Sequence, residues 1–449
     1  MAQISVVGAG YVGLVTGACF AYLGHMVTCI DIDPDKVAGL RRGILPIYEP
    51  ELGDLVTKGL REGRLAFELE PETSIPGSDF VIVAVQTPTN SNGASDLRAL
   101  LKAFHTFAPL IRPGAVVIQK STAPVGMAAF LERLIARYHG SSVAVVANPE
   151  FLREGSAVHD FFKPHRIVIG AANQDAAVQV ATLYAFADCP VIVADPNTAE
   201  MIKYAANAFL ATKVSFINEI AQICEAFGVD VGQVAEGIGH DPRIGPYFLG
   251  AGLGWGGSCL PKDIKALIHM AKVSSVSPRL LEAVQRVNAS QKRQAVWKLR
   301  AMIGDLTGAV VGLLGLAFKP GTDDIRSAPS MELAAALLGS GVHVRAYDPV
   351  AMPRARLIAP NIAYHDDPLA MADGADALIL VTEWPEFQNL DMAEVQRRMR
   401  RPVLLDGRNF WDGKAMQNLG FVYAGFGVGS SARKSRSFLD AALVGSEAL

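Results

Sequence analysis

A glycine pattern close to the N-terminus constrains the fold of this chain more than any other feature. The stretch GAGYVG places Gly8, Gly10 and Gly13 in a G-x-G-x-x-G arrangement, directly after the apolar run ISVV and before a helical pattern. In a strand–turn–helix unit the first glycine permits the tight turn. The second lets the backbone approach a pyrophosphate, and the third allows close packing of the helix on the strand. The sequence therefore predicts a dinucleotide-binding loop that also contains Tyr11 and Val12.

An aspartate ends the next apolar run, MVTCID. A carboxylate at this place accepts hydrogen bonds from a ribose 2′-hydroxyl and repels a 2′-phosphate, which favours NAD over NADP. We interpret Asp31 as this residue. Asp33 follows two residues later and is the neighbouring candidate, and either aspartate could simply end a strand.

The rest of the chain indicates two sheets joined by a helix. The apolar runs DFVIVAV, AVVIQ, VAVVA and RIVIG alternate with helical stretches, which predicts a parallel, doubly wound sheet. From Asn197 to about Phe227 neither proline nor internal glycine occurs, so we expect one long helix with Asn197 and Glu200 as a capping box and Gly228 as its stop. After about residue 305 the pattern returns, and HVRAYDP echoes MVTCIDIDP.

We therefore expect an α/β protein with two Rossmann-like doubly wound parallel-sheet domains joined by a long central helix. The expected divisions are 1–196, 197–304, 305–428 and a tail of 429–449.

Composition excludes several classes of partner. The 449 residues are 50% apolar and carry a formal net charge of −3 without a dominant basic block, so we expect no nucleic-acid partner. No apolar stretch is long enough to span a bilayer, and the N-terminus lacks the features of a signal peptide. The five cysteines are widely spaced, and no Cys/His cluster predicts a metal. We expect a cytoplasmic protein of a reducing compartment, without metal or membrane partner.

The stretch GWGGSCLPKD sets a cysteine in an unusual place. Pro261 is favoured in the first turn of a helix, and a helix beginning there would direct its amide groups towards the sulfur of Cys259. Together with Lys262 this setting stabilises a thiolate. Asp263 lies four residues after the cysteine. A cysteine is more often inert and buried, which is how we interpret the other four.

Polar residues on the long helix and at two strand ends complete the candidate site. Lys203 and Asn207 share a helix face because they are four residues apart, and together they could stabilise an oxyanion. The ordinary alternative is a solvated face. Glu150 and Glu154 in NPEFLREG, and Thr122 in KSTAPVG, follow apolar runs, where open α/β sheets bind their ligands. A surface ion pair could equally explain either glutamate.

These residues together resemble the nucleotide-sugar 6-dehydrogenases, the UDP-glucose/GDP-mannose dehydrogenase family. The similarity extends from residue 1 to about 428 and rests on GAGYVG, KSTAPVG, NPEFLREG, EMIKYAANAFLATKVSFINE, GWGGSCLPKD and AFKPGTDDIRSAPS. It implies an NAD-binding N-terminal domain, a long connecting helix and a C-terminal nucleotide-sugar-binding domain. It also implies NAD as cofactor and a homodimer, as is usual for bacterial members.

The resemblance implies oxidation of a primary alcohol at sugar C6 to a carboxylate, with two NAD⁺ used in turn. Cys259 would attack the intermediate aldehyde, the thiohemiacetal would be oxidised to a thioester, and water would hydrolyse it. Lys203 and Asn207 match the pair that holds the C6 oxygen. The positions implied for activation of the water are Asp263, Thr122 and Glu154.

Further roles follow from matching positions. Besides the glycine loop and Asp31, the implied NAD contacts are Lys36, Thr87, Thr122, Glu154, Lys262 and Arg326. The implied substrate contacts are Glu150, Phe151, Leu152, Arg153, Lys203, Asn207, Arg243, Tyr247, Phe248, Leu249, Gly250, Ala251, Gly252, Gly256, Lys319 and Arg408. Glu150 is assigned a supporting role, and Arg243 matches an arginine that reaches the neighbouring subunit. Trp255 stands where Phe or Tyr is more usual.

Three alternatives stay open. A two-electron β-hydroxyacid dehydrogenase also combines a Rossmann domain with a Lys-x-x-x-Asn helix, but its chain is shorter and has no need of Cys259. A non-catalytic NAD-responsive protein would keep the glycines without needing Lys203 and Cys259 together. Within the family, GDP-mannose or UDP-N-acetylmannosamine could replace UDP-glucose. The stretch DPRIGPYFLGAGLGWGGSCLPKD looks most like the UDP-glucose branch, so UDP-glucose is the expected substrate and UDP-glucuronate the expected product.

Overall fold

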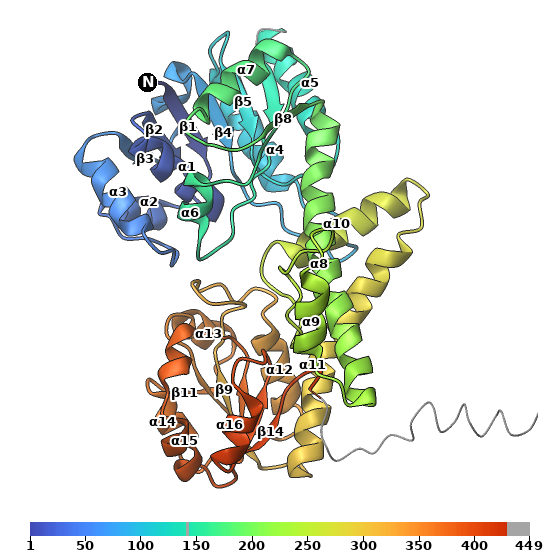
Figure 1. Cartoon of the computed structure of the whole chain (residues 1–449). Coiled ribbons are helices and arrows are strands. Elements are labelled where there is room, and N and C mark those ends of the chain that lie inside the picture. Colours follow the sequence, from blue (N-terminus) through green and yellow to red (C-terminus); the bar gives the residue numbers. More distant parts are fainter. Residues whose placement is uncertain (141–142, 429–449) are drawn as a thin grey trace, which may run out of the picture. The chain divides into compact units, whose positions relative to one another are not determined.

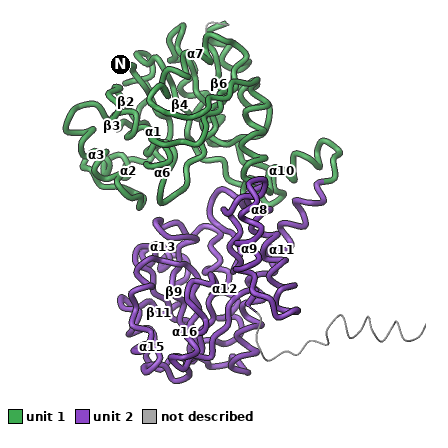
Figure 2. Tube along the Cα trace, in the orientation of Figure 1, with its two compact units in different colours: residues 1–207, 262–277 green, residues 208–261, 278–449 purple. Residues whose placement is uncertain are grey.

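The computed structural model describes residues 1–140 and 143–428, so the predicted tail 429–449 lies outside the described residues. It divides into two compact units (Figures 1 and 2). The first comprises residues 1–207 and 262–277, and the second comprises the rest of the described chain. Two helices, α8 (Pro196–Phe227) and α10 (Leu260–Val273), contribute residues to both units.

The first unit contains an eight-stranded sheet in the order β3-β2-β1-β4-β5-β6-β7-β8. Its strands are β1 (Gln3–Val7), β2 (Met26–Ile30), β3 (Leu65–Glu68), β4 (Phe80–Val83), β5 (Val116–Gln119), β6 (Ala144–Ala147), β7 (Ile167–Gly170) and β8 (Val191–Ala194). Its helices besides α8 and α10 are α1 (Tyr11–Tyr22), α2 (Pro34–Arg41), α3 (Leu52–Arg61), α4 (Arg98–Phe107), α5 (Met127–His139), α6 (Ala157–Phe162) and α7 (Gln174–Leu183). The strand order reverses its direction at β1, which places the glycine loop at the switch point of the sheet.

The doubly wound design follows from strands that are apolar on both faces. Alternate residues of β1 enter different clusters, with Val6 packing in the cluster that contains α1 and Val7 in the one that contains α4 and α5. Each strand predicted from an apolar run is present. Two strands, β3 and β8, were not predicted. LAFE is a four-residue strand at one edge of the sheet that ends in a glutamate, and VIVA is a four-residue apolar run at the opposite, exposed edge. One junction departs from the parallel prediction, since β7 runs antiparallel to β6 through the pair Ala147 and Gly170.

The long helix is confirmed, but its predicted capping box is wrong. Asp195 caps α8, because its Oδ1 accepts the amide N–H of Thr198 and its Oδ2 accepts the Thr198 hydroxyl. The carboxylate of Glu200 is used elsewhere, where it accepts the amide N–H groups of Gly126 and Ala128. The helix ends before Gly228, whose φ of +68° is the left-handed conformation expected at a helix stop.

The second unit contains a parallel six-stranded sheet in the order β11-β10-β9-β12-β13-β14. Its strands are β9 (Val310–Leu314), β10 (His343–Tyr347), β11 (Ala363–Tyr364), β12 (Ala377–Leu380), β13 (Val403–Asp406) and β14 (Val422–Ala424). Its helices besides α8 and α10 are α9 (Val231–Gly239), α11 (Arg279–Ile303), α12 (Pro329–Leu338), α13 (Met352–Ile358), α14 (Pro368–Ala372), α15 (Met392–Arg398) and α16 (Gly413–Asn418). The predicted second sheet of Rossmann type is therefore confirmed.

The two sheets differ at the aspartate that follows their second strand. Asp31 follows β2, and Asp348 follows β10 at the corresponding place. Asp348 is fully buried and accepts hydrogen bonds from four backbone N–H groups and from Nε1 of Trp384. A carboxylate has about four lone-pair sites, so Asp348 is saturated by protein donors. Asp348 therefore stabilises the turns of the second unit and is closed to a ribose.

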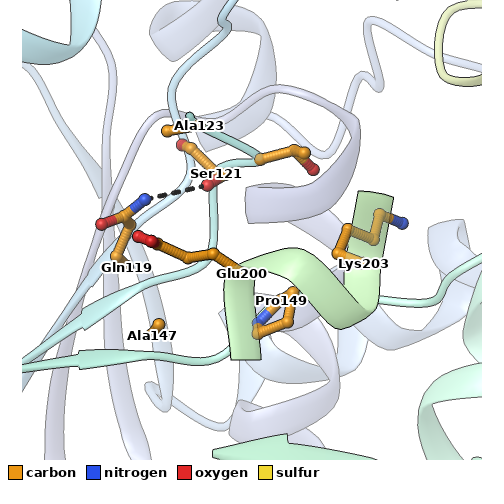
Figure 3. Close-up of a pocket in the computed structure, with 8 residues that line it drawn as sticks. Gln119, Ser121, Ala123, Ala147, Pro149, Glu200 and Lys203 are labelled. Carbon is orange, nitrogen blue, oxygen red and sulfur yellow. Dashed lines mark hydrogen bonds between the residues drawn. The ribbon is translucent and has the colours of Figure 1, made fainter. Parts of the chain in front are cut away.

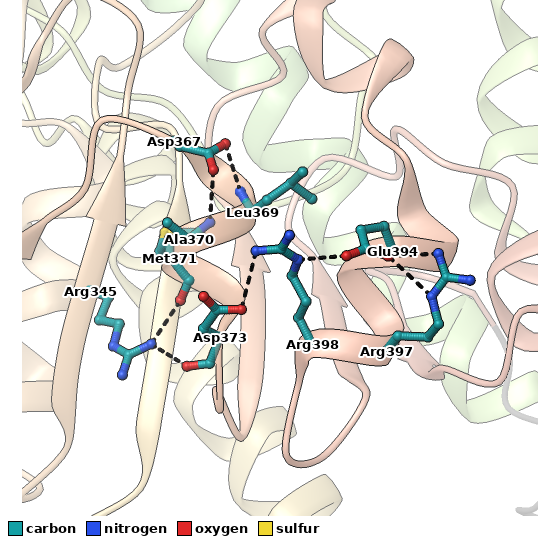
Figure 4. A network of polar contacts seen from close by, with 9 residues as sticks. All are labelled: Arg345, Asp367, Leu369, Ala370, Met371, Asp373, Glu394, Arg397 and Arg398. Carbon is teal, nitrogen blue, oxygen red and sulfur yellow. Dashed lines mark hydrogen bonds and ion pairs between the residues drawn. The ribbon is translucent and has the colours of Figure 1, made fainter.

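The basic run RRMRR in the second unit is neutralised by carboxylates, as Figure 4 shows for part of it. Arg397 and Arg398 both pair with Glu394, with N–O distances of 2.6 and 2.7 Å. Arg400 makes a bidentate contact with buried Asp376. These arginines are therefore bound to carboxylates of the second unit and do not form a free cationic patch.

Candidate active site

The glycine loop has the geometry that a pyrophosphate requires. A Cβ on Gly8, whose φ is +99°, would lie 2.8 Å from the carbonyl oxygen of Ala84, and one on Gly13 would lie 1.8 Å from the carbonyl oxygen of Gly8. A Cβ on Gly10 would meet nothing within 4 Å. Two glycines thus allow close packing, while the middle one leaves open space beside the backbone at the start of α1. The loop fits a dinucleotide.

Asp31 is held in place beside this loop. Its Oδ2 accepts the amide N–H of Ala9 at 2.9 Å and the Nζ of Lys36 at 2.9 Å, and its Oδ1 accepts the amide N–H of Asp33. Asp33 itself caps α2, because it accepts the amide N–H groups of Asp35 and Lys36. The neighbouring aspartate therefore has a structural task, which leaves Asp31 as the candidate for the ribose.

The face of α8 that carries Lys203 and Asn207 is buried. Lys203 is 4% exposed and its Nζ lies 3.1 Å from Oε1 of Glu150. Asn207 is 7% exposed and its Nδ2 donates to Oδ2 of Asp263 at 2.6 Å. The solvated-face alternative is therefore wrong, and so is a surface ion pair as the explanation of Glu150. Lys203 and Asn207 are thus each held by a different carboxylate, an arrangement that positions an ammonium and an amide.

Asp263 receives a second donor from its own helix. Lys262 Nζ lies 2.6 Å from Oδ1 of Asp263, which is 1% exposed. The carboxylate is thus bound on one oxygen by a cation and on the other by an amide.

Glu200, three residues before Lys203 on α8, has a role that the sequence did not predict. Glu200 is buried, and its oxygens accept the amide N–H groups of Gly126 and Ala128 at 2.6 and 2.8 Å, which caps α5. Burial raises the pKa of this carboxyl, although these bonds oppose the shift. Figure 3 shows Glu200 directed towards Gln119 and Ser121, while the Lys203 amine points the other way. Its spacing of three residues from Lys203 was the available signal.

Glu200 and Lys203 both line a small pocket at the carboxyl ends of β5 and β6. The pocket residues are Gln119, Ser121, Thr122, Ala123, Ala147, Pro149, Glu200 and Lys203. The carbonyl oxygen of Thr122 accepts the hydroxyl of buried Thr87 at 2.6 Å. The predicted Thr122 therefore lies beside the predicted lysine, on a loop that Thr87 and Glu200 both hold.

The segment from Glu150 to Glu154 is fixed from several directions. The centroid of the Phe151 ring lies 3.5 Å from the guanidinium carbon of Arg166 and 5.2 Å from Lys203 Nζ. The amide N–H of Leu152 donates to Glu150 at 2.6 Å. Arg153 makes a bidentate contact with Asp160 and is itself exposed.

Glu154 is buried, and the turn that follows it is fixed by two further side chains, Glu49 and Tyr11. The amide N–H of Gly155 donates to Oε2 of Glu49 at 2.6 Å and to the hydroxyl of Tyr11 at 2.8 Å. Oε1 of Glu49 accepts the amide N–H of Ala157 at 2.6 Å. Glu49 was missed because its partners lie more than 100 residues away in the sequence, whereas Tyr11 is part of the predicted glycine loop.

The cysteine loop belongs to the second unit. Cys259 is half-buried, directly precedes α10, and has its Sγ 3.5 Å from the hydroxyl of Ser258. A Cβ on Gly256 would lie 2.3 Å from the carbonyl oxygen of Ser327, and one on Gly257 would lie 2.7 Å from the Phe318 ring. The two glycines therefore let the cysteine loop pack closely against Ser327 and Phe318.

The other cysteines have a different environment. Burial raises the pKa of the thiols of Cys19, Cys29, Cys189 and Cys224. That of Cys29 rises to about 12. A thiol with a raised pKa is a poor nucleophile near neutral pH because little thiolate is present. This supports the interpretation that these four are inert.

The remaining predicted residues also lie in the second unit. Arg408 donates from Nη1 to the carbonyl oxygen of Gly254 at 3.1 Å, so it contacts the cysteine loop directly. Arg326 pairs with Asp324, and Arg243 pairs with Asp241. Lys319 Nζ lies 5.7 Å from the centroid of the Phe318 ring. Within the predicted run 247–252, Tyr247, Phe248 and Gly250 are exposed, Leu249 and Ala251 are buried, and Gly252 donates its amide N–H to Asn218.

Comparison with known proteins defines the class. Family models of the UDP-glucose/GDP-mannose dehydrogenase family match the NAD binding domain at residues 2–188, the central domain at 197–290 and the UDP binding domain at 312–413. The chain belongs to this family, and its cofactor is NAD.

Individual relatives agree over nearly the whole chain. UDP-glucose 6-dehydrogenase TuaD of Bacillus subtilis is 44% identical over 95% of this chain and 93% of its own. A UDP-glucose dehydrogenase from the archaeon Pyrobaculum islandicum is 40% identical with a TM-score of 0.89, covering 96% of this chain and 98% of its own. A UDP-D-ManNAc dehydrogenase from Pyrococcus horikoshii is 30% identical with a TM-score of 0.85, covering 95% and 99%.

No helix in the described part of the chain is long and apolar enough to cross a membrane. Within residues 1–140 and 143–428, no group of three or more His, Cys, Asp or Glu side chains is placed to hold a metal ion.

Proposed function

We propose that this protein oxidises UDP-glucose at C6 to UDP-glucuronate, a four-electron oxidation that consumes two NAD⁺ and one water per sugar. The buried face of α8 carries the proposal. Lys203 and Asn207 are each held by a carboxylate, Glu150 and Asp263, and α10, which supplies Asp263, follows directly after Cys259. A two-electron dehydrogenase has no use for this cysteine.

The first unit binds the cofactor through the glycine loop and Asp31. When bound, NAD⁺ serves as the electron acceptor of both oxidations. Gly10 leaves space for the pyrophosphate, and Asp31 accepts from the ribose. Lys36, which pairs with Asp31, completes this part of the cofactor site.

The side chains of this protein carry out the remaining steps at the sugar C6 carbon. The alcohol is first oxidised to the C6 aldehyde, and the Cys259 thiolate attacks that carbon. The new C–S bond turns the carbonyl into an oxyanion that Lys203 and Asn207 stabilise. Oxidation of this thiohemiacetal leaves a thioester, which releases the Cys259 thiolate when water attacks. Asp263 takes a proton from the water, with Thr122 and Glu154 in supporting contact.

UDP-glucose is the substrate that the comparisons favour. The relatives at 44% and 40% identity are named for UDP-glucose, and the one named for UDP-D-ManNAc is at 30%. The test is kcat/KM for UDP-glucose, GDP-mannose and UDP-N-acetylmannosamine with NAD⁺. We expect kcat/KM for UDP-glucose to exceed that for either of the other two by about 100-fold or more, as is typical of a pocket whose polar groups bind one particular sugar. Equal or higher kcat/KM for either competitor would reassign the substrate.

The protein is proposed to act as a homodimer. On α8, Phe209, Phe216 and Ile223 recur every seven residues and are 65%, 50% and 49% exposed. Large apolar side chains aligned in this way on one helix are typical of an interface. We expect light scattering to give the mass of two chains, and Phe216→Glu to shift it towards one chain. A monomeric wild-type protein would refute the dimer.

The reducing cytoplasm is the proposed compartment. None of the five cysteines, all of which lie in the described part of the chain, forms a disulfide. The proposed reaction also requires Cys259 as a thiolate, which an oxidising compartment would not preserve.

A further inference from the structure

The backbone of the cysteine loop is held by Asn288, a residue of α11 that no motif singles out. Its Oδ1 accepts the amide N–H of Trp255 at 2.8 Å, and its Nδ2 donates to the carbonyl oxygen of Trp255 at 3.0 Å. A primary amide that binds both backbone groups of one residue acts like a neighbouring strand. Asn288 is buried, so neither bond is easily replaced by water.

The loop backbone approaches α11 so closely that residue 254 must be a glycine. A Cβ on Gly254 would lie 2.2 Å from Oδ1 of Asn288, and Gly254 has a φ of +87°. Its carbonyl oxygen accepts from Arg408 at 3.1 Å. The loop is therefore held on both sides of the Gly254–Trp255 peptide.

The indole of Trp255 provides a separate attachment. Its Nε1 donates to the hydroxyl of Ser215 at 3.0 Å, and that hydroxyl donates to the carbonyl oxygen of Val284 at 3.0 Å. A phenylalanine at position 255 could not donate this bond. The ring is thereby oriented by α8 while the backbone is held by α11.

The contacts between Asn288 and Trp255 lie close to Cys259 in the sequence. Three residues separate Trp255 from Cys259, and the two glycines among them lie against Ser327 and Phe318. A shift of the Trp255 backbone therefore passes along the loop to Sγ. Misplacement of a reacting group by about 1 Å can cost ~10²-fold in rate.

We propose that Asn288 is a positioning residue for Cys259, holding the loop so that Sγ attacks the aldehyde before the aldehyde escapes. This inference rests on the proposed role of Cys259. The matched control is Gln291, which lies one turn further along α11, is 1% exposed, and has an amide without a hydrogen-bond partner in the described part of the chain. Asn288→Ala and Gln291→Ala thus remove the same group from the same helix, and only the first frees the loop.

The experiment measures kcat, KM for UDP-glucose, and the fraction of turnovers that release aldehyde, trapped with an aminooxy probe. For Asn288→Ala we expect kcat to fall ~10–100-fold and aldehyde release to rise several-fold, with KM changed by less than about threefold. Gln291→Ala should keep wild-type aldehyde release. If Asn288→Ala shows no more aldehyde release and no lower kcat than Gln291→Ala, Asn288 is structural only and the inference fails.

Two further variants keep the outcomes distinct. Asn288→Asp retains the shape and the acceptor for the Trp255 amide but opposes two oxygens at the Trp255 carbonyl. It should also raise aldehyde release, and it serves if Asn288→Ala does not fold. Cys259→Ser is measured in parallel. Near wild-type turnover by Cys259→Ser would overturn the proposed function itself, whereas an inactive Cys259→Ser beside an unaffected Asn288→Ala would overturn only the positioning role.

Discussion

Asn207 donates from Nδ2 to Oδ2 of Asp263 over 2.6 Å, although 56 residues separate them in the sequence. Lys262 holds the other oxygen of the same carboxylate at 2.6 Å. The bond joins the residue proposed to stabilise the oxyanion to the residue proposed to activate water. Attack and hydrolysis therefore share one hydrogen-bonded group.

Asp263→Asn should separate hydrolysis from the earlier steps. The amide keeps the shape but cannot take a proton from water, so the thioester should accumulate on Cys259. Intact-protein mass spectrometry after mixing with UDP-glucose and NAD⁺ should show the adduct, and Asp263→Asn/Cys259→Ala should not. Wild-type turnover by Asp263→Asn would remove Asp263 from the mechanism.

Lys203→Ala should slow turnover more than it weakens UDP-glucose binding. Loss of an oxyanion donor typically lowers kcat by ~10²–10³-fold. It also leaves Glu150 buried without its cation, and breaking such a pair costs about 3–5 kcal/mol of stability. The control is Lys203→Met/Glu150→Gln, which should recover thermal stability but not kcat. Recovery of kcat in that double variant would show that Lys203 acts only on folding.

Asp31→Ser should relax the choice of cofactor. The carboxylate repels a 2′-phosphate, and its removal ends that repulsion. We expect the ratio of kcat/KM for NAD⁺ over NADP⁺ to fall by about tenfold or more, equivalent to about 1.4 kcal/mol. Asp33→Ser is the matched control, because Asp33 caps α2. A larger effect at Asp33 than at Asp31 would reverse the assignment.

Asp376 should make the stability of the second unit depend on acid pH. Burial opposes its ionisation, but hydrogen bonds from Arg400 and from the amide of Val310 outweigh this and hold the pKa of Asp376 below its ordinary value. A lowered folded pKa stabilises the fold above the unfolded pKa of about 3.9, and this contribution is lost as pH falls through the folded value.

Asp376→Asn should therefore lower Tm at pH 7, and the difference from wild type should shrink towards pH 3. The control is Asp373→Asn, three residues earlier (Figure 4), whose side chain is exposed and whose Arg398 contact is 3.4 Å. It should change Tm little at either pH, as surface pairs do. A pH-independent Tm difference for Asp376→Asn would contradict the linkage.

Cys259→Ser should bind UDP-glucose but lose overall turnover. Serine is a far weaker nucleophile at neutral pH, and its ester leaves less readily than a thioester. The missing step follows the aldehyde, so added 6-aldehyde should not rescue the variant. Near wild-type NADH release would show that the cysteine of GWGGSCLPKD is structural.

The sequence predicted those parts of the molecule that local patterns determine. The glycine turn, the long helix and the second sheet each depend on spacing within a short stretch, and each is confirmed. The predicted capping box is wrong because Asp195 caps the helix two residues earlier, so Asn197 lies inside the first turn of α8, and the Glu200 carboxylate bonds Gly126 and Ala128 instead. Strand β8 was not predicted although VIVA is an apolar run, and its side chains lie largely exposed at the sheet edge, so apolar character alone does not report burial there.

The candidate site divides in the same way. Lys203 and Asn207 were found because four-residue spacing marks one helix face. Their partners Glu150 and Asp263 were named separately, but no spacing predicts which carboxylate meets which donor across more than 50 residues. Glu49, Glu200 and Asn288 were missed for this reason, since each acts through backbone groups of a distant loop.

Four-electron chemistry at one carbon fixes the number of NADH formed per UDP-glucose consumed, so this ratio is the decisive measurement. The count is made with limiting UDP-glucose and excess NAD⁺, following absorbance at 340 nm and product by mass spectrometry. We expect two NADH for each UDP-glucose, with UDP-glucuronate as the product and no aldehyde accumulating. One NADH per sugar with aldehyde as the product would contradict it.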